Sequence, residues 1–83
     1  MKITFKLFAG LSEFLPDGAK KYSVFLEVPE SCSMNSLIDL HHIPRDQVHL
    51  ILINGSPTHQ SERDESLLKD GDAVAMWPPV AGG

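Results

Sequence analysis

The chain has 83 residues, of which 42% are hydrophobic, with a formal net charge of -4. A chain of this length forms one small domain with one sheet and one or two helices, too little for a core plus an enclosed active site, so an enzyme is not expected. The negative charge argues against nucleic acid as the main partner, because phosphate binding requires a basic face, and it permits docking on a basic protein surface.

The lone Cys32 allows no internal disulfide, which is typical of a reducing compartment. The sequence begins with no charged and apolar leader and holds no apolar run of about 18 residues, so neither export nor a membrane span is expected. We therefore predict a cytoplasmic protein.

The first quarter of the chain predicts a pair of strands separated by a short helix. Residues 2–8 alternate polar and apolar side chains, which indicates a half-buried strand. Residues 11–15 carry apolar side chains at helical spacing before Pro16, and residues 22–28 predict the second strand of the pair. The side chains expected to face the core are Ile3, Phe5, Leu7, Val24, Leu26 and Val28.

The main helix is predicted between Ser33, a suitable N-cap, and Pro44, which would end it. Its expected apolar stripe consists of Leu37, Leu40 and His41. We expect this helix to lie across one face of the sheet.

The second half of the chain predicts the remaining strands. Residues 49–53 form a near-continuous apolar run, which indicates a central strand, and Asn54-Gly55 is a strong signal for a tight turn. Residues 58–65 are polar and predict a short edge strand or a loop, and Leu67-Leu68 is expected to pack onto the core. The last strand is predicted over residues 73–77.

The order of these elements predicts an α+β fold of the β-grasp type. A parallel pairing of the first and last strands would place both near the centre of a mixed sheet of four to five strands, with the one main helix packed on one face. We interpret residues 1–83 as a single domain with a flexible C-terminal tail over residues 78–83.

The end of the chain is its most unusual feature. Gly82-Gly83 adds nothing to a core, but two residues without Cβ atoms can enter a narrow slot and leave a terminal carboxylate unobstructed. Pro78 and Pro79 favour an extended arm that holds this end away from the body. The composition therefore indicates a tail that another protein handles.

The run LKDGDAVAMWPPVAGG, preceded by ILINGSP, resembles the small ubiquitin-like sulfur carriers of the MoaD/ThiS family. This family includes the small subunit of molybdopterin synthase and the sulfur carrier of thiamine biosynthesis. The match to the molybdopterin synthase subunit is closer, because Pro-Pro-Val-x-Gly-Gly after Gly-Asp-x-Val-Ala is typical of it. The resemblance covers nearly the whole chain, is specific from about Ile51 onward, and implies a ubiquitin-like β-grasp domain.

The resemblance implies a carrier without catalytic residues of its own and without a stably bound cofactor. An adenylating enzyme of the MoeB/ThiF type would use ATP to activate the carboxylate of Gly83, and sulfur would then replace AMP to leave a C-terminal thiocarboxylate. The large subunit of molybdopterin synthase would be the second partner. The tail residues implied to enter that partner's active site are Pro78, Pro79, Val80, Ala81 and Gly82.

Two groups of alternatives remain open. The same tail chemistry would serve thiamine biosynthesis or tRNA thiolation. A ubiquitin-like modifier would instead join Gly83 to lysines of target proteins, and a plain interaction module would keep Gly83 as an unmodified carboxylate.

Trp77 is a candidate docking residue. Alternation along the last strand places Val74 and Met76 on one face and Ala73, Ala75 and Trp77 on the other. If the first pair packs under the helix, Trp77 lies on the open face beside the tail, where a large aromatic among small residues is typical of an interface anchor. The alternative is a tryptophan that covers the end of the core.

The histidines and the cysteine do not predict a chemical site. His41 and His42 would point about 100° apart on a helix, and His49 and His59 have no cysteine or carboxylate at ligand spacing, so no metal site is expected. Cys32 stands at a helix start, where the dipole would lower the pKa of its thiol, but a small buried or half-buried thiol is the favoured interpretation. A solvated face, with a docking patch as the alternative, is the interpretation of the acidic residues Glu62, Asp64 and Glu65.

Overall fold

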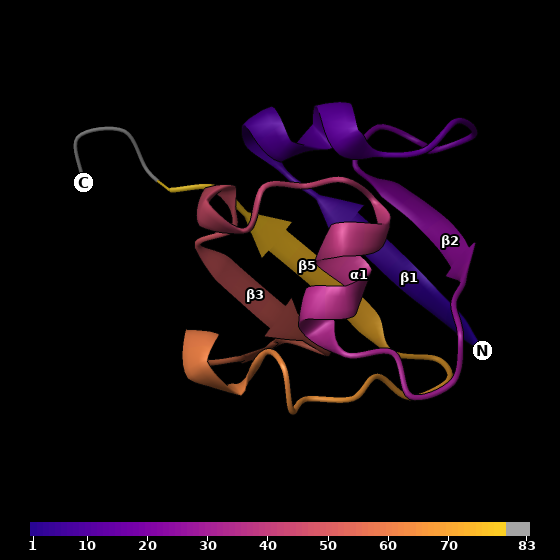
Figure 1. Cartoon of the computed structure of the whole chain (residues 1–83). Helices are drawn as coiled ribbons and strands as arrows, with labels where there is room; N and C mark the ends of the chain where they lie inside the picture. The colour runs from indigo at the N-terminus through magenta and orange to yellow at the C-terminus, as the bar shows by residue number, and fades with distance from the viewer. Residues whose placement is uncertain (80–83) are drawn as a thin grey trace.

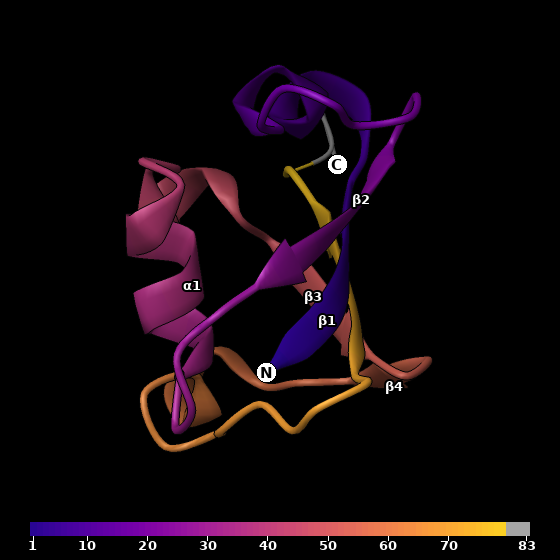
Figure 2. The ribbon, with the colours of Figure 1, turned by 90° about the vertical axis from the view of Figure 1, so that its right-hand side faces the viewer.

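A computed structural model describes residues 1–79 and shows a five-stranded sheet crossed on one face by the main helix (Figure 1). In a view turned by 90°, the main helix lies on one side of the sheet only (Figure 2). No helix in the described range is long and apolar enough to cross a membrane. The elements are β1 (Lys2–Leu7), the 3-10 helix η1 (Ala9–Phe14), β2 (Ser23–Glu27), α1 (Met34–Leu40), η2 (Arg45–Gln47), β3 (Leu50–Ile53), β4 (Ser56–Pro57), η3 (Gln60–Glu62) and β5 (Ala73–Trp77).

The strand order is β2-β1-β5-β3-β4, with β1 and β5 parallel and the other pairs antiparallel. This arrangement confirms the predicted β-grasp fold and the inner position of the first and last strands. β3 is an inner strand, as predicted, between β5 and the two-residue edge strand β4, and β5 takes the middle position of the sheet. The tight turn at Asn54-Gly55, where both residues have positive φ, folds β4 back onto the outer side of β3.

One continuous core fills the space between the sheet and α1. The alternation predicted for β1 is confirmed, because its odd-numbered side chains are buried and its even-numbered ones are not. β1 and β5 contribute to the core from the same face of the sheet, as their parallel register requires. The buried apolar residues are Ile3, Phe5, Leu7, Leu11, Val28, Cys32, Met34, Leu37, Ile38, Ile43, Val48, Ile51, Leu68, Val74 and Met76.

The main helix begins as predicted but is shorter and rotated. Ser33 caps it, since its side-chain oxygen accepts a hydrogen bond from the Ser36 N–H at 3.1 Å. The helix ends at Leu40, before the left-handed residue His42. Leu40 is 53% exposed, contrary to the prediction, and Ile38 takes its place in the buried stripe. The reason is that positions 34, 37, 38 and 41 share one face of this helix.

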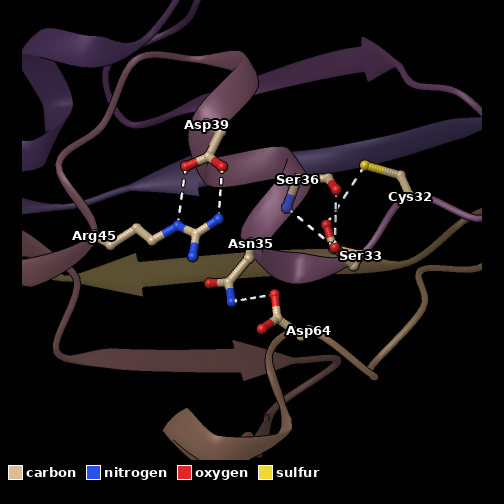
Figure 3. A network of polar contacts seen from close by, with 7 residues as sticks. All are labelled: Cys32, Ser33, Asn35, Ser36, Asp39, Arg45 and Asp64. Carbon is tan, nitrogen blue, oxygen red and sulfur yellow. Dashed lines mark hydrogen bonds and ion pairs between the residues drawn. The ribbon is translucent and has the colours of Figure 1, made fainter.

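Side chains on the outer surface of α1 tie it to two later segments (Figure 3). Asn35 donates a hydrogen bond of 2.7 Å to the Asp64 carboxylate, in the turn that follows η3. Arg45 donates through Nε and Nη2 to the two oxygens of Asp39, at 3.1 and 2.7 Å. The Arg45 guanidinium also holds the pKa of the Asp39 carboxyl below its usual range. These contacts fix η2 and the loop after β4 against the helix.

The segment after β4 takes the second of its two predicted forms, a loop, and the edge strand precedes it. The edge strand lies at Ser56–Pro57, and the polar residues that follow form η3 and turns instead of a strand. Leu68 is buried as expected, whereas Leu67 is 54% exposed. Arg63 is buried and donates to the backbone carbonyls of Val48 and His49 at 3.0 and 3.1 Å. A charged residue that fills the core and satisfies backbone carbonyls cannot be recognised from its place in a polar stretch.

Candidate docking face and tail

The two faces of β5 have opposite environments. Val74 and Met76 are fully buried, whereas Ala73, Ala75 and Trp77 are half-buried on the face turned away from α1. The predicted division of this strand is therefore confirmed. We call the sheet surface opposite α1 the open face.

Trp77 packs on another aromatic residue of the open face instead of covering the core. Its ring stacks on that of Phe8, with centroids 4.6 Å apart and an angle of 7° between the planes. Phe8 is held there by its N–H, which donates to the Met76 carbonyl at 3.1 Å. Tyr22 also packs on Phe8, with ring centroids 5.5 Å apart and an angle of 34° between the planes. This three-ring group, which we call the aromatic ladder, restrains the Trp77 ring.

Apolar side chains continue across the open face from the ladder. In the register of the sheet, Leu50 lies opposite Trp77 and Leu52 lies opposite Ala75. At the far margin, Phe25 is 83% exposed on the edge strand β2. A small domain that leaves such side chains uncovered presents a surface suited to a protein partner.

The predicted docking set of Ala73, Ala75 and Trp77 thus shares one face, but it omits most of the large side chains there. Phe8 and Phe25 were missed even though a signal was present. Strand alternation places both positions on the solvent face, where a large apolar side chain such as phenylalanine is not expected. Leu50 and Leu52 were missed because an apolar run gives no sign of which residues face the uncovered side.

The tail leaves the sheet directly beside the ladder. Pro78 is half-buried and Pro79 is exposed at the end of β5. The other predicted tail residues, Val80, Ala81, Gly82 and Gly83, lie outside the described residues, and their assigned roles stay predictions.

Cys32 is a buried thiol, as the favoured interpretation had it. It is 5% exposed, and burial raises its pKa, which is opposite to the lowering expected from the helix start. The thiol donates a weak hydrogen bond to the Ser33 carbonyl, with an S···O distance of 3.5 Å (Figure 3). Burial outweighs the helix terminus here because the thiolate would lose its hydration.

The histidines are dispersed over the structure. His41 stacks on Phe5 with ring centroids 5.0 Å apart, and its pKa is lowered by burial and, second, by the charge of His42. Within residues 1–79 no group of three or more histidine, cysteine or acidic side chains lies in position to hold a metal ion.

Comparison with solved structures places this architecture among small ubiquitin-like proteins. A protein assigned as molybdopterin converting factor subunit 1 from Pyrococcus furiosus is 26% identical, with a TM-score of 0.67 over 95% of this chain and 98% of that one. Small archaeal modifier protein 1 from Methanosarcina acetivorans is 28% identical, with a TM-score of 0.62 over 99% and 96%. The thiamine biosynthesis protein ThiS from Geobacter metallireducens shares the fold at 21% identity, with a TM-score of 0.67 over the whole of both chains.

These neighbours confirm the resemblance to the MoaD/ThiS type drawn from the C-terminal run. No curated protein matches the chain significantly. The family model described as Mut7-C ubiquitin matches residues 1–82, nearly the whole sequence. With its β-grasp sheet, its single main helix and this match, the chain belongs to the Mut7-C ubiquitin family.

Proposed function

We propose that the protein is a sulfur carrier whose reactive group is the C-terminal carboxylate of Gly83. An adenylating enzyme of the MoeB/ThiF type uses ATP to form an acyl-adenylate there and releases pyrophosphate. The terminal sulfur of an enzyme persulfide attacks the acyl carbon, and AMP leaves. A thiol then reduces the acyl disulfide and frees the thiocarboxylate, which is a better nucleophile than the carboxylate.

The observation that supports this proposal best is the position of the aromatic ladder. Trp77 is the last residue of β5, and the chain continues from it straight into the Pro-Pro arm. A partner can therefore bind the open face while the tail enters the active site of that partner. The body contributes docking surface, and the partner contributes the catalytic groups.

We propose molybdopterin synthesis as the pathway and the large synthase subunit as the sulfur-transfer partner, with residues 78–82 entering its active site. The Pro-Pro-Val-x-Gly-Gly end supports this choice, as does the 26% identity to the Pyrococcus protein. Subunits 1 and 2 of the molybdopterin-converting factor from Helicobacter pylori form a complex, and the matched chain is 20% identical, with a TM-score of 0.57 over both full lengths. Sulfur transfer to a thiamine precursor or to tRNA is the competing outcome.

Intact-mass analysis tests the tail chemistry. After incubation with the activating enzyme, ATP and a persulfide donor, the C-terminal peptide should gain the mass difference between sulfur and oxygen. The proposal also requires Gly83 to be the last residue of the mature protein in cells. A cellular protein that carries residues beyond Gly83, or repeated absence of the mass gain, would contradict it.

Two tail variants locate the reactive group. An alanine added after Gly83 should abolish adenylation, because the carboxylate moves about 3.5 Å along an extended chain and gains a neighbouring Cβ. Gly82→Val should also block adenylation by closing a narrow channel to the tail. Thermal unfolding of both variants should match that of the unmodified chain, which separates tail chemistry from folding.

Protein modification is a second candidate function, favoured by the 28% identity to small archaeal modifier protein 1. In that case the same adenylate would pass to a lysine, forming an isopeptide bond. Peptides branched through Gly83 in a cellular digest would favour the modifier. Thiocarboxylate without branched peptides would favour the carrier.

A further inference from the structure

A hollow lies beside the point where the chain leaves β5, and it combines apolar walls with two carboxylates. Its apolar lining comes from η1, from the segment before η2 and from the start of the arm, and its acids come from η1 and η2. We call it the root hollow; the members used here are Leu11, Phe14, Pro44, Pro78, Glu13 and Asp46.

The two acids have no cation of their own within the described residues. Glu13 and Asp46 are exposed and take part in no ion pair there. The cation next to Asp46 in sequence is Arg45, and both its Nε and Nη2 groups are directed to Asp39. The root hollow therefore offers unneutralised carboxylates next to apolar surface.

An arginine side chain suits this combination better than other side chains. Its aliphatic stem can cover apolar surface such as Pro44 and Pro78, and its flat guanidinium can lie on the half-buried Phe14 ring. Its several N–H groups can serve two carboxylates, whereas an ammonium group acts as a point charge. An acidic or purely apolar side chain would leave the negative charges of Glu13 and Asp46 unneutralised.

The position of the hollow identifies the protein that would supply this arginine. Pro78 lines it, and Gly83 is the fifth residue after Pro78, a reach of at most about 17 Å in an extended chain. An enzyme that acts on the carboxylate of Gly83 therefore lies within about 17 Å of Pro78, close enough to contact the root hollow. The activating enzyme is needed for every product of the tail, whether thiocarboxylate or isopeptide.

We propose that the root hollow binds an arginine side chain of the activating enzyme, which orients the carrier so that its tail enters the adenylation site. This inference rests on the proposed function. It also refines what the net charge of -4 implies. Two acids line the hollow at Pro78, whereas the lysines Lys6 and Lys21 lie near the aromatic ladder.

The first test uses the whole chain without any enzyme. Nα-acetyl-L-argininamide, titrated against labelled protein, should shift the NMR signals of Leu11 and Phe14 in a saturable way. The uncharged citrulline analogue should not. The double variant Glu13→Gln/Asp46→Asn should lose the response, and the matched variant Glu62→Gln/Glu65→Gln, with the same change in net charge, should keep it. Equal shifts with both compounds, or in both variants, would overturn the site.

The second test measures adenylation by pyrophosphate exchange. The Glu13→Gln/Asp46→Asn variant should raise the KM for the carrier at least tenfold with kcat nearly unchanged, and the Glu62→Gln/Glu65→Gln control should stay within twofold of the unmodified chain. Added salt should raise the KM of the unmodified carrier more than the KM of the Glu13→Gln/Asp46→Asn variant. Equal KM values for the two variants would overturn the assignment to the activating enzyme.

The two tests separate this inference from the proposed function. If the unmodified chain is never adenylated, the proposed function fails, and with it the activating enzyme as occupant, while the titration still decides whether the hollow selects a guanidinium. If the chain is adenylated but the hollow variant behaves like its control, the function stands and this inference fails.

Discussion

The two faces of the sheet differ in what their apolar side chains do. On the helix side, Val74 and Met76 of β5 are fully buried under α1 and η1. On the open face, Trp77 in the same strand is only half-buried and rests on Phe8. Both faces are rich in apolar side chains, but only one is covered within the described chain. The comparison teaches that one face holds the fold together, while the other keeps its aromatic side chains packed on one another at the surface.

The largest expected effect on stability comes from truncating a buried side chain on the helix side of the sheet. Met76→Ala should lower the free energy of unfolding by about 2–5 kcal/mol, because it removes a fully buried side chain and leaves a cavity in the core. Urea denaturation followed by circular dichroism measures the loss. A loss well under 1 kcal/mol would show that this face is not the stabilising one.

The neighbouring residue should respond in the opposite way. Trp77→Ala should weaken binding to the partner by roughly 2 kcal/mol or more, the range of interface anchors, while the unfolding free energy falls less than for Met76→Ala. Calorimetric titration with the activating enzyme and urea denaturation measure the two quantities. If the variant loses its cooperative thermal transition, Trp77 belongs to the core and the contrast between the faces fails.

A smaller effect is expected from the residue that supports the tryptophan. Phe8→Ala should cost about 1 kcal/mol of partner binding, because it removes the stack that restrains Trp77. The fluorescence of the only tryptophan should report a more solvated ring. Phe25→Ala, which changes an exposed ring outside the ladder, should leave that fluorescence unchanged, and equal spectral shifts in both variants would refute the supporting role.

The smallest expected effect is a pH dependence of stability that arises from His41, on the helix side of the sheet. Burial, with the charge of His42 second, lowers the pKa of His41, so the unfolded chain binds this proton at a higher pH than the folded chain does. Stability should therefore be complete above the unperturbed value of roughly 6.5 and fall as the pH drops through it. Urea midpoints between neutral and mildly acidic pH measure the slope.

A matched pair of variants assigns this slope. His41→Phe keeps a ring against Phe5 without titrating and should flatten it. His59→Gln, at an exposed position, should not. If the slope survives in His41→Phe, another group is responsible for it.

Local signals predicted much of the fold. The alternation in β1 and β5, the Ser33 cap and the Asn54-Gly55 turn each depend on residues close in sequence, and each was predicted correctly. The errors arose where a distant contact decides the outcome. Leu40 faces solvent because of the way α1 is rotated on the sheet. Arg63 is buried, and its guanidinium donates a hydrogen bond to the Val48 carbonyl, 15 residues earlier in the chain.

The candidate site divides in the same way. The sequence by itself determined the β-grasp order, the two faces of β5 and the residue types of the tail, because strand alternation and turn chemistry are local properties. Only the tertiary structure decided which face stays uncovered, that Phe8 stacks on Trp77, and that Glu13 and Asp46 line one hollow together with Pro78. A period of two separates the faces of a strand, but the packing of remote elements selects which face is covered.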